Sequence, residues 1–299
     1  MAIPESQLHT WSAQGSIQQS AATYQTLKNT LEDKNAPYSH RPFYTFLQGS
    51  YGNDTNIWSD SDVDIVICTT SVFYYDVDSL ADYEQRNFHT AFPSAASYSY
   101  QDFRKEVTVW LTQRYGQAVH PGKKAIFIQG SGNRRDADVL PAAEYRQYYE
   151  HRDATSTGYW RGIVFWKTDG TKVVNFPKQH SDNCTTKHQG TSSWFKPTVR
   201  VFKNIRNKMI QLGILEDGMA PSYYIEGLLY NVPNQLFGQS FQRTVLSCLS
   251  YFGNADQSMF KCANGIHPLL RDNSEVSWPP DHCTRFLKTL QFYWDHYQG

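Results

Sequence analysis

The pattern of hydrophobic and polar positions divides the chain into a first part rich in strands and a second part rich in helices. Apolar residues up to about Leu31 recur at roughly helical spacing. An amphipathic helix is predicted over 101–115, ending at Gly116. Runs typical of strands occur at 43–48, 62–69, 125–129, 136–140, 159–166 and 172–176. Beyond Pro177 the pattern predicts helices at 196–212, 221–230, 241–251 and 280–297.

Strands followed by helices indicate the α+β fold class. We therefore predict a bilobal protein, with a mixed sheet and an N-terminal helix in a lobe at 1–176 and a C-terminal helical lobe at 177–299. The junction between the lobes is expected near 175–195. Clefts between lobes are where ligands tend to bind, so the helical lobe is expected to complete the site.

Charge limits the classes of partner. The 299 residues carry 28 Lys and Arg and 28 Asp and Glu, which gives a formal net charge of zero. Binding to duplex nucleic acid depends largely on neutralising phosphates, so a large nucleic-acid footprint usually comes with a basic excess. We predict no obligatory nucleic-acid partner. The 20 Tyr, 17 Phe and 8 Trp could stack on bases, but packing of a bulky core explains them as well.

Cysteine usage and hydropathy indicate a cytoplasmic protein. The five cysteines are scattered without a CxxC pair, which is typical of a reducing compartment. The first residues, MAIPESQLHTW, lack the pattern of an export signal, and no apolar run reaches membrane-spanning length. We expect no membrane partner.

Paired carboxylates are the sharpest chemical signal. Asp62 and Asp64 are two apart on a predicted strand, so both side chains project from one face. They precede an apolar run, where two unneutralised carboxylates would repel each other and resist desolvation. A divalent cation removes both problems, and Asp138 can join if its strand pairs beside theirs. Spacing alone leaves Asp60 with Asp62 as an alternative pair, and a lone DxD is more often a solvated strand end.

Gly49 and Ser50 follow a predicted strand and open a helical turn. Such a break offers backbone N–H groups and a hydroxyl to a phosphate, and Gly49 has no side chain to obstruct the approach of a triphosphate. Any turn can contain this pair, so the ordered combination with the three carboxylates carries the argument. Phosphoryl transfer explains the combination, because one cation would activate an attacking hydroxyl and a second would neutralise the leaving pyrophosphate.

The segment GSYGNDTNIWSDSDVDIVI resembles the GS…T…SDxDI signature of the DNA polymerase beta-like nucleotidyltransferases. ADVLPAAEYR is similar to the segment around that superfamily's third carboxylate in the branch of oligoadenylate synthases, cyclic GMP-AMP synthase and the bacterial cyclic-oligonucleotide synthases. The resemblance selects Asp62 and Asp64 over Asp60, and Asp138 over Asp136. It implies a polymerase beta-like bilobal fold, with three catalytic carboxylates that hold two Mg²⁺ ions, Mn²⁺ being the alternative cation.

Later segments extend the resemblance to about residue 230. NFP…H from Asn175, VRVFK from Val199 and PSYYIE from Pro221 are similar to the NP..H, VR..K and pSy..E segments of the family. The resemblance implies that Lys203 and Ser222 contact the donor triphosphate, and it places Tyr223 among the nucleotide-binding residues. ATP is expected among the substrates.

The predicted helix at 196–212 has one basic face, formed by Lys196, Arg200 and Lys203. A solvated basic face is common, but the position of this one after the junction favours a triphosphate clamp. His180, Cys184 and His188 recur at intervals of four without the paired spacing of a structural zinc site, so we predict no zinc there.

We therefore predict a cyclic-oligonucleotide synthase that makes a cyclic dinucleotide or trinucleotide as a second messenger in anti-phage defence. A linear 2′-5′ oligonucleotide synthase, a small-molecule (antibiotic) nucleotidyltransferase and an inactive nucleotide-binding scaffold are the alternatives. A protein regulator, or a ubiquitin-transfer-like enzyme that acts on Gly299, is the predicted partner, although glycine ends many chains by chance.

Overall fold

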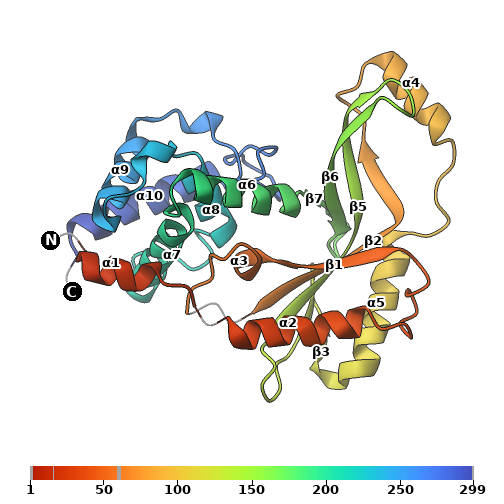
Figure 1. Ribbon diagram of the computed structural model, residues 1–299, viewed down its shortest axis with the longest axis horizontal. Coiled ribbons are helices and arrows are strands. Elements are labelled where there is room, and N and C mark those ends of the chain that lie inside the picture. The colour runs from red at the N-terminus through yellow and green to blue at the C-terminus, as the bar shows by residue number, and fades with distance from the viewer. Residues whose placement is uncertain (1–2, 16, 59–61, 298–299) are drawn as a thin grey trace. The chain divides into compact units, whose positions relative to one another are not determined.

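The computed structural model describes residues 3–15, 17–58 and 62–297 (Figure 1). It separates into two compact units. The sheet unit comprises Gln18–Gln48 and Ser61–Pro177, and the helical unit comprises Met1–Ile17, Gly49–Asp60 and Lys178–Gly299.

The sheet unit is built on one mixed sheet with the strand order β1-β2-β5-β4-β3, and β6 and β7 extend it from β5. β2 and β5 run parallel, and the other pairs are antiparallel. The long β5 holds β4 and β6 on the same edge, because β4 covers Ala137–Val139 and β6 begins to pair at Ala143. The strands are β1 (Phe43–Gln48), β2 (Val63–Asp76), β3 (Val119–Pro121), β4 (Ile126–Ile128), β5 (Ala137–His151), β6 (Thr157–Trp166) and β7 (Lys172–Asn175).

Helices α2 (Gln18–Leu31), α4 (Asp82–Ala91) and α5 (Tyr100–Tyr115) complete the sheet unit. The α5 helix begins where Ser99 caps the amide of Asp102 and ends at Gly116, whose φ of 58° suits a residue without a side chain. The indole of Trp110 donates to the carbonyl of Thr30 at 2.8 Å and so joins α5 to α2. Figure 1 shows α4 beside the far ends of β2 and β5.

The helical unit has its core around α7 (Phe195–Gln211). The apolar face of α7 is fully buried through residues such as Val199, Phe202 and Ile205. The other helices are α1 (Glu5–Ser12), α3 (Gly49–Gly52), α6 (Pro177–Gly190), α8 (Ser222–Tyr230), α9 (Phe241–Asn254) and α10 (Pro280–Asp295). Short 3-10 turns are η1 (Gly116–Ala118), η2 (Asn234–Leu236) and η3 (Gln257–Met259). Among the described residues, no helix combines the length and apolarity that a membrane span requires.

The α+β class with a mixed sheet and a C-terminal set of helices is confirmed. The division after Pro177 lies one residue from the predicted boundary, but 1–17 and 49–60 group with the helices rather than with the sheet. Segment 53–56 does so because its carbonyls and side chains hydrogen-bond to α7, α8 and the residues after α1. The opening stretch forms two helices rather than one, and β2 and β5 are longer than predicted.

Candidate active site

The three predicted carboxylates lie at one end of the parallel β2–β5 pair. Asp64 and Asp138 are register partners, and Val63, which precedes Asp64, pairs with Ala137. The amide of Val63 donates to the carbonyl of Asp136 at 3.1 Å and fixes the start of the pair. Asp62 is exposed just before β2, while Asp64 and Asp138 are half-buried. The strand pairing on which the sequence argument depended is therefore confirmed.

The electrostatics of Asp138 show how the carboxylates affect one another. Burial raises the pKa of Asp138, and the negative charge of Asp62 raises it further. A carboxyl group with a raised pKa holds its negative charge at a cost, and a bound cation would remove that cost.

Asp136 has a separate structural task. Its Oδ1 accepts from the amide of Gly130 at 2.5 Å and closes the hairpin between β4 and β5. This hydrogen bond explains an aspartate two residues before Asp138 without a metal. Asp60, the alternative partner of Asp62, lies outside the described residues.

Gly49 and Ser50 begin α3 directly after β1. Gly49 has a φ of 70°, a left-handed conformation that favours glycine. The turn is closed by two backbone hydrogen bonds, from the amide of Asn53 to the carbonyl of Gly49 at 3.1 Å and from the amide of Thr55 to the carbonyl of Ser50 at 2.9 Å. The chain runs into this turn from Gln48, whose register partner on β2 is Asp64.

The basic face of α7 is buried and holds segment 53–55. Lys203, which is 0% exposed, donates from Nζ to the carbonyl of Thr55 at 2.9 Å. Arg200 donates from Nη1 to the carbonyl of Asp54 at 2.6 Å, and Lys196 donates to the Asp54 carboxylate at 2.9 Å. The face is therefore not a solvated one. Contact between Lys203 and a triphosphate, which stays a prediction, would require the amino group to share or leave the Thr55 carbonyl.

Ser222 and Tyr223 form the first turn of α8. The Ser222 hydroxyl accepts from Nη1 of Arg206 at 3.3 Å. The Tyr223 ring stacks on His180, with ring centroids 4.7 Å apart and an interplanar angle of 22°. The Tyr223 hydroxyl also accepts from the side-chain amide of Asn264 at 3.1 Å. Both predicted nucleotide-binding residues are thus held in place by neighbours, and their contact with a nucleotide stays a prediction.

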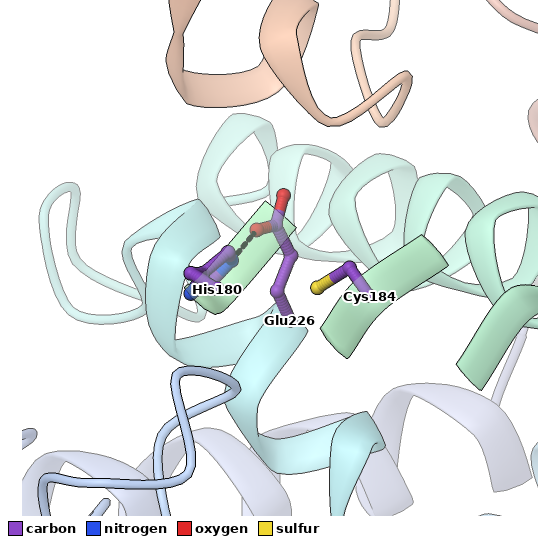
Figure 2. A group of neighbouring side chains, drawn as sticks. All are labelled: His180, Cys184 and Glu226. Carbon is purple, nitrogen blue, oxygen red and sulfur yellow. Dashed lines mark hydrogen bonds and ion pairs between the residues drawn. The ribbon is translucent and has the colours of Figure 1, made fainter. Parts of the chain in front are cut away.

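His180, Cys184 and Glu226 form a buried cluster in which each residue offers one ligand atom within 4.8 Å of the others (Figure 2). Nε2 of His180 lies 2.5 Å from Oε2 of Glu226. His188, the third residue of the sequence pattern, belongs elsewhere, since its Nδ1 accepts from the amide of Lys196 at 3.4 Å. The sequence analysis did not identify Glu226 as a member of this cluster, although Glu226 ends the Pro221–Glu226 segment that carried the resemblance.

Comparison with known proteins identifies the class. A family model described as the cGAS/DncV-like nucleotidyltransferase C-terminal helical domain matches residues 182–295. The chain is 36% identical over 296 residues to the cyclic UMP-AMP synthase of Rhodothermus marinus, covering 98% of each protein. It is 31% identical to the cyclic nucleotide synthase CdnE01 of Staphylococcus haemolyticus, covering 99% of this chain and 100% of that protein. The chain belongs to the cGAS/DncV-like nucleotidyltransferases.

Solved structures agree with this assignment. The structure of Rhodothermus marinus CdnE c-UMP-AMP synthase with Apcpp and Upnpp matches with a TM-score of 0.88 at 36% identity, covering 99% of this chain and 98% of that one. The structure of Elizabethkingia meningoseptica CdnE cyclic dinucleotide synthase with GTP and Apcpp matches with a TM-score of 0.74 at 26% identity, covering 98% of each chain. The resemblance seen in the sequence motifs is confirmed.

Proposed function

We propose that this chain joins nucleoside triphosphates into a cyclic oligonucleotide, a cyclic dinucleotide or trinucleotide, with release of pyrophosphate. The observation that carries the proposal is the register pairing of Asp64 with Asp138 on parallel strands, with the charge of Asp62 acting on Asp138. Relatives that match nearly the whole chain are named cyclic nucleotide synthases, which supports a cyclic product over a linear one.

The three carboxylates fit Mg²⁺, with Mn²⁺ as a substitute. They supply hard oxygen ligands, and a cation would offset both effects that raise the pKa of Asp138, its burial and the negative charge of Asp62. When bound, the ions would supply activation of the attacking hydroxyl and charge neutralisation on the triphosphate. Asp62, Asp64 and Asp138 are the residues proposed to hold them.

The helical unit is proposed to bind the donor triphosphate through Gly49, Ser50, Ser222, Tyr223 and Lys203. The Gly49 turn would bring backbone close to the phosphates, and the hydroxyls of Ser50 and Ser222 would donate to them. The chain itself connects this turn to the carboxylates, because Gly49 follows Gln48, the partner of Asp64.

Each joining step transfers a nucleotidyl group from a donor triphosphate to a ribose hydroxyl. A ribose hydroxyl oxygen forms a bond to the α-phosphorus of the donor, the bond from that phosphorus to the bridging oxygen breaks, and the hydroxyl proton is lost. Pyrophosphate takes the electron pair of the broken bond. Repetition on the linear intermediate, with its own triphosphate as donor, closes the ring.

The test is incubation of the purified protein with each of the four labelled ribonucleoside triphosphates, alone and mixed, in Mg²⁺. A product whose chromatographic mobility phosphatase leaves unchanged, and which a nuclease degrades, would support a ring, because a ring has no terminal phosphate. A linear product, or transfer to an added small-molecule acceptor only, would assign the alternatives. Absence of pyrophosphate release with every mixture would leave the scaffold interpretation.

We further propose that the cyclic product serves as a second messenger in anti-phage defence. Control by a protein partner and modification at Gly299 by a ubiquitin-transfer-like enzyme are part of the same proposal. Gly299 lies outside the described residues. Native-host extracts resolved by mass spectrometry would test the modification: a conjugate through the Gly299 carboxyl group supports it, and an unmodified terminus in the presence of a ligase-like neighbour contradicts it.

A further inference from the structure

Glu226 of α8 is a buried carboxylate that receives three side-chain donors. Thr55 donates from Oγ1 to Oε1 at 2.5 Å, and Asn53 donates from Nδ2 to Oε2 at 3.0 Å. Nε2 of His180 lies 2.5 Å from the same Oε2. Glu226 is only 2% exposed, so both of its oxygens are satisfied inside the protein. Two of the donors come from the segment after the Gly49–Ser50 turn, and the third comes from α6.

The surroundings keep this carboxylate ionised. Burial raises the pKa of Glu226, but the hydrogen bond and charge of His180, the hydroxyl of Thr55 and the charge of Lys203 together hold it below its ordinary value. A buried carboxylate with several donors is an ordering element, because loss of one acceptor leaves a buried donor unpaired. The donors of segment 53–55 are therefore tied to one orientation of Glu226.

A metal ion does not explain the cluster as well. Ligand atoms at about 2.0–2.2 Å from a tetrahedral cation lie about 3.3–3.6 Å from one another, whereas Nε2 of His180 and Oε2 of Glu226 are 2.5 Å apart, which is a hydrogen-bond distance. Figure 2 shows the His180–Glu226 hydrogen bond within the cluster. The arrangement is that of a hydrogen-bonded centre.

Segment 53–55 transmits this restraint to the predicted phosphate-binding turn. The amide of Thr55 donates to the carbonyl of Ser50, and the amide of Asn53 donates to the carbonyl of Gly49. On the other side, Glu226 lies four residues after Ser222 on α8, so both side chains project from neighbouring positions of the same helix face. One carboxylate thus connects the Gly49–Ser50 turn to the first turn of α8.

We propose that Glu226 is a positioning residue that fixes the spacing between Ser50 and Ser222, and hence the fit of the donor triphosphate. The inference rests on the proposed function, since it assigns the triphosphate to these two hydroxyls. Lys203 acts on the same segment from α7, through the Thr55 carbonyl.

Two matched substitutions at Thr55 test the inference. Thr55→Val keeps the shape and loses the hydroxyl, whereas Thr55→Ser keeps the hydroxyl and loses a methyl group. Affinity for a non-hydrolysable ATP analogue in Mg²⁺ is the readout, measured by calorimetry beside the thermal midpoint. We expect Thr55→Val to bind at least fivefold more weakly and Thr55→Ser to bind within twofold of the wild type. Equal affinity of Thr55→Val and the wild type would overturn the inference.

Glu226→Gln extends the test, because the amide keeps one acceptor and turns an NH₂ group toward the donors. We expect a loss of about tenfold or more in affinity, and the double variant with Thr55→Val should bind no more weakly than Glu226→Gln alone. If the fold-loss in affinity of the double variant equals the product of the two single-variant losses, Thr55 and Glu226 act independently, which would contradict the inference. Glu84→Gln is the control: Glu84 is 8% exposed in the sheet unit and accepts from the amides of Ala81 and His151. It should lower the thermal midpoint and leave affinity within twofold.

The outcomes separate this inference from the proposed function. Suppose that the wild type binds the analogue and releases pyrophosphate, and that Thr55→Val and Glu226→Gln bind the analogue as tightly as the wild type does. This result would overturn the positioning role alone. Wild-type protein that neither binds nor reacts would overturn both. If Glu226→Gln does not fold, the Thr55→Val and Thr55→Ser pair decides the question.

Discussion

Asp64 and Asp138 are register partners on the parallel strands β2 and β5, which α4, α5, η1, β3 and β4 separate in the chain. In a parallel pair, residues in register present their side chains on the same face of the sheet. Backbone pairing thereby places the two acidic residues side by side. The fold maintains this arrangement at a cost in stability that a bound cation would offset.

The first prediction concerns that cost. Asp138→Asn should raise the thermal midpoint in the presence of a chelator by on the order of a few degrees, because it removes a carboxylate whose pKa is raised by burial and by Asp62. The same variant should lose pyrophosphate release. Calorimetry in chelator, beside a turnover assay in Mg²⁺, makes both measurements.

The control is Asp136→Asn, which keeps the Oδ1 acceptor for the amide of Gly130. It should change neither the thermal midpoint in chelator nor turnover by more than a small factor. If Asp136→Asn abolished turnover and Asp138→Asn did not, the assignment of the third carboxylate would be wrong.

The second prediction concerns Lys203. Lys203→Met should destabilise the fold by about 1–3 kcal/mol, because the carbonyl of Thr55 loses a buried charged donor. Lys208→Met on the exposed side of α7 is the matched control and should be near neutral. Denaturant unfolding measures the difference. If Lys203 also contacts the triphosphate, affinity for a non-hydrolysable analogue falls by a further 1.5–3 kcal/mol, on the order expected for one charged hydrogen bond.

The third prediction is a pH dependence that comes from His267. Burial lowers the pKa of His267 to about 4 from the ordinary 6.5. The unfolded chain therefore takes up a proton on this side chain before the folded one does, so its contribution to stability is complete above pH 6.5 and is lost as the pH falls toward 4. His267→Gln should lose less stability than the wild type over this window, by at most about 3 kcal/mol. An unchanged pH profile would contradict the prediction, and the exposed His120→Gln is the control.

Motif order predicted that the strands carrying Asp64 and Asp138 lie side by side, and the structure pairs them. An acidic pair before an apolar strand and an aspartate in a hairpin strand are local features, and together with the resemblance they selected Asp138 over Asp136. The alternation of polar and apolar residues could not show that β4 and β6 share one edge of β5, because strand neighbours depend on pairing across the whole sheet.

The environment of the basic helix could not be predicted from sequence. Helical spacing groups Lys196, Arg200 and Lys203 on one face, but a face that binds solvent and a face that binds backbone carbonyls have the same periodicity. Their partners, Asp54 and Thr55, lie far away in the chain. The hydrogen-bond partners of Glu226 could not be predicted either, because a single acidic residue in an apolar helix gives no local sign of which donors will bind it.

The fourth prediction concerns activation. The net charge is zero, and the basic face of α7 is committed to segment 53–55. We therefore expect turnover by nuclease-treated protein with Mg²⁺ and triphosphates alone, or with a protein partner. A turnover assay before and after nuclease treatment, with duplex DNA or RNA added back, measures this. Strong stimulation by nucleic acid would contradict it.

The most direct test of the central claim compares the products of the wild type and of Asp62→Asn/Asp64→Asn in one assay. Both proteins are incubated with the four labelled triphosphates and Mg²⁺, and the products are treated with phosphatase before chromatography. We predict a phosphatase-resistant cyclic product and pyrophosphate from the wild type, and neither from the double variant, which should remain folded by circular dichroism. Retained turnover in the folded double variant would contradict a reaction that depends on these carboxylates.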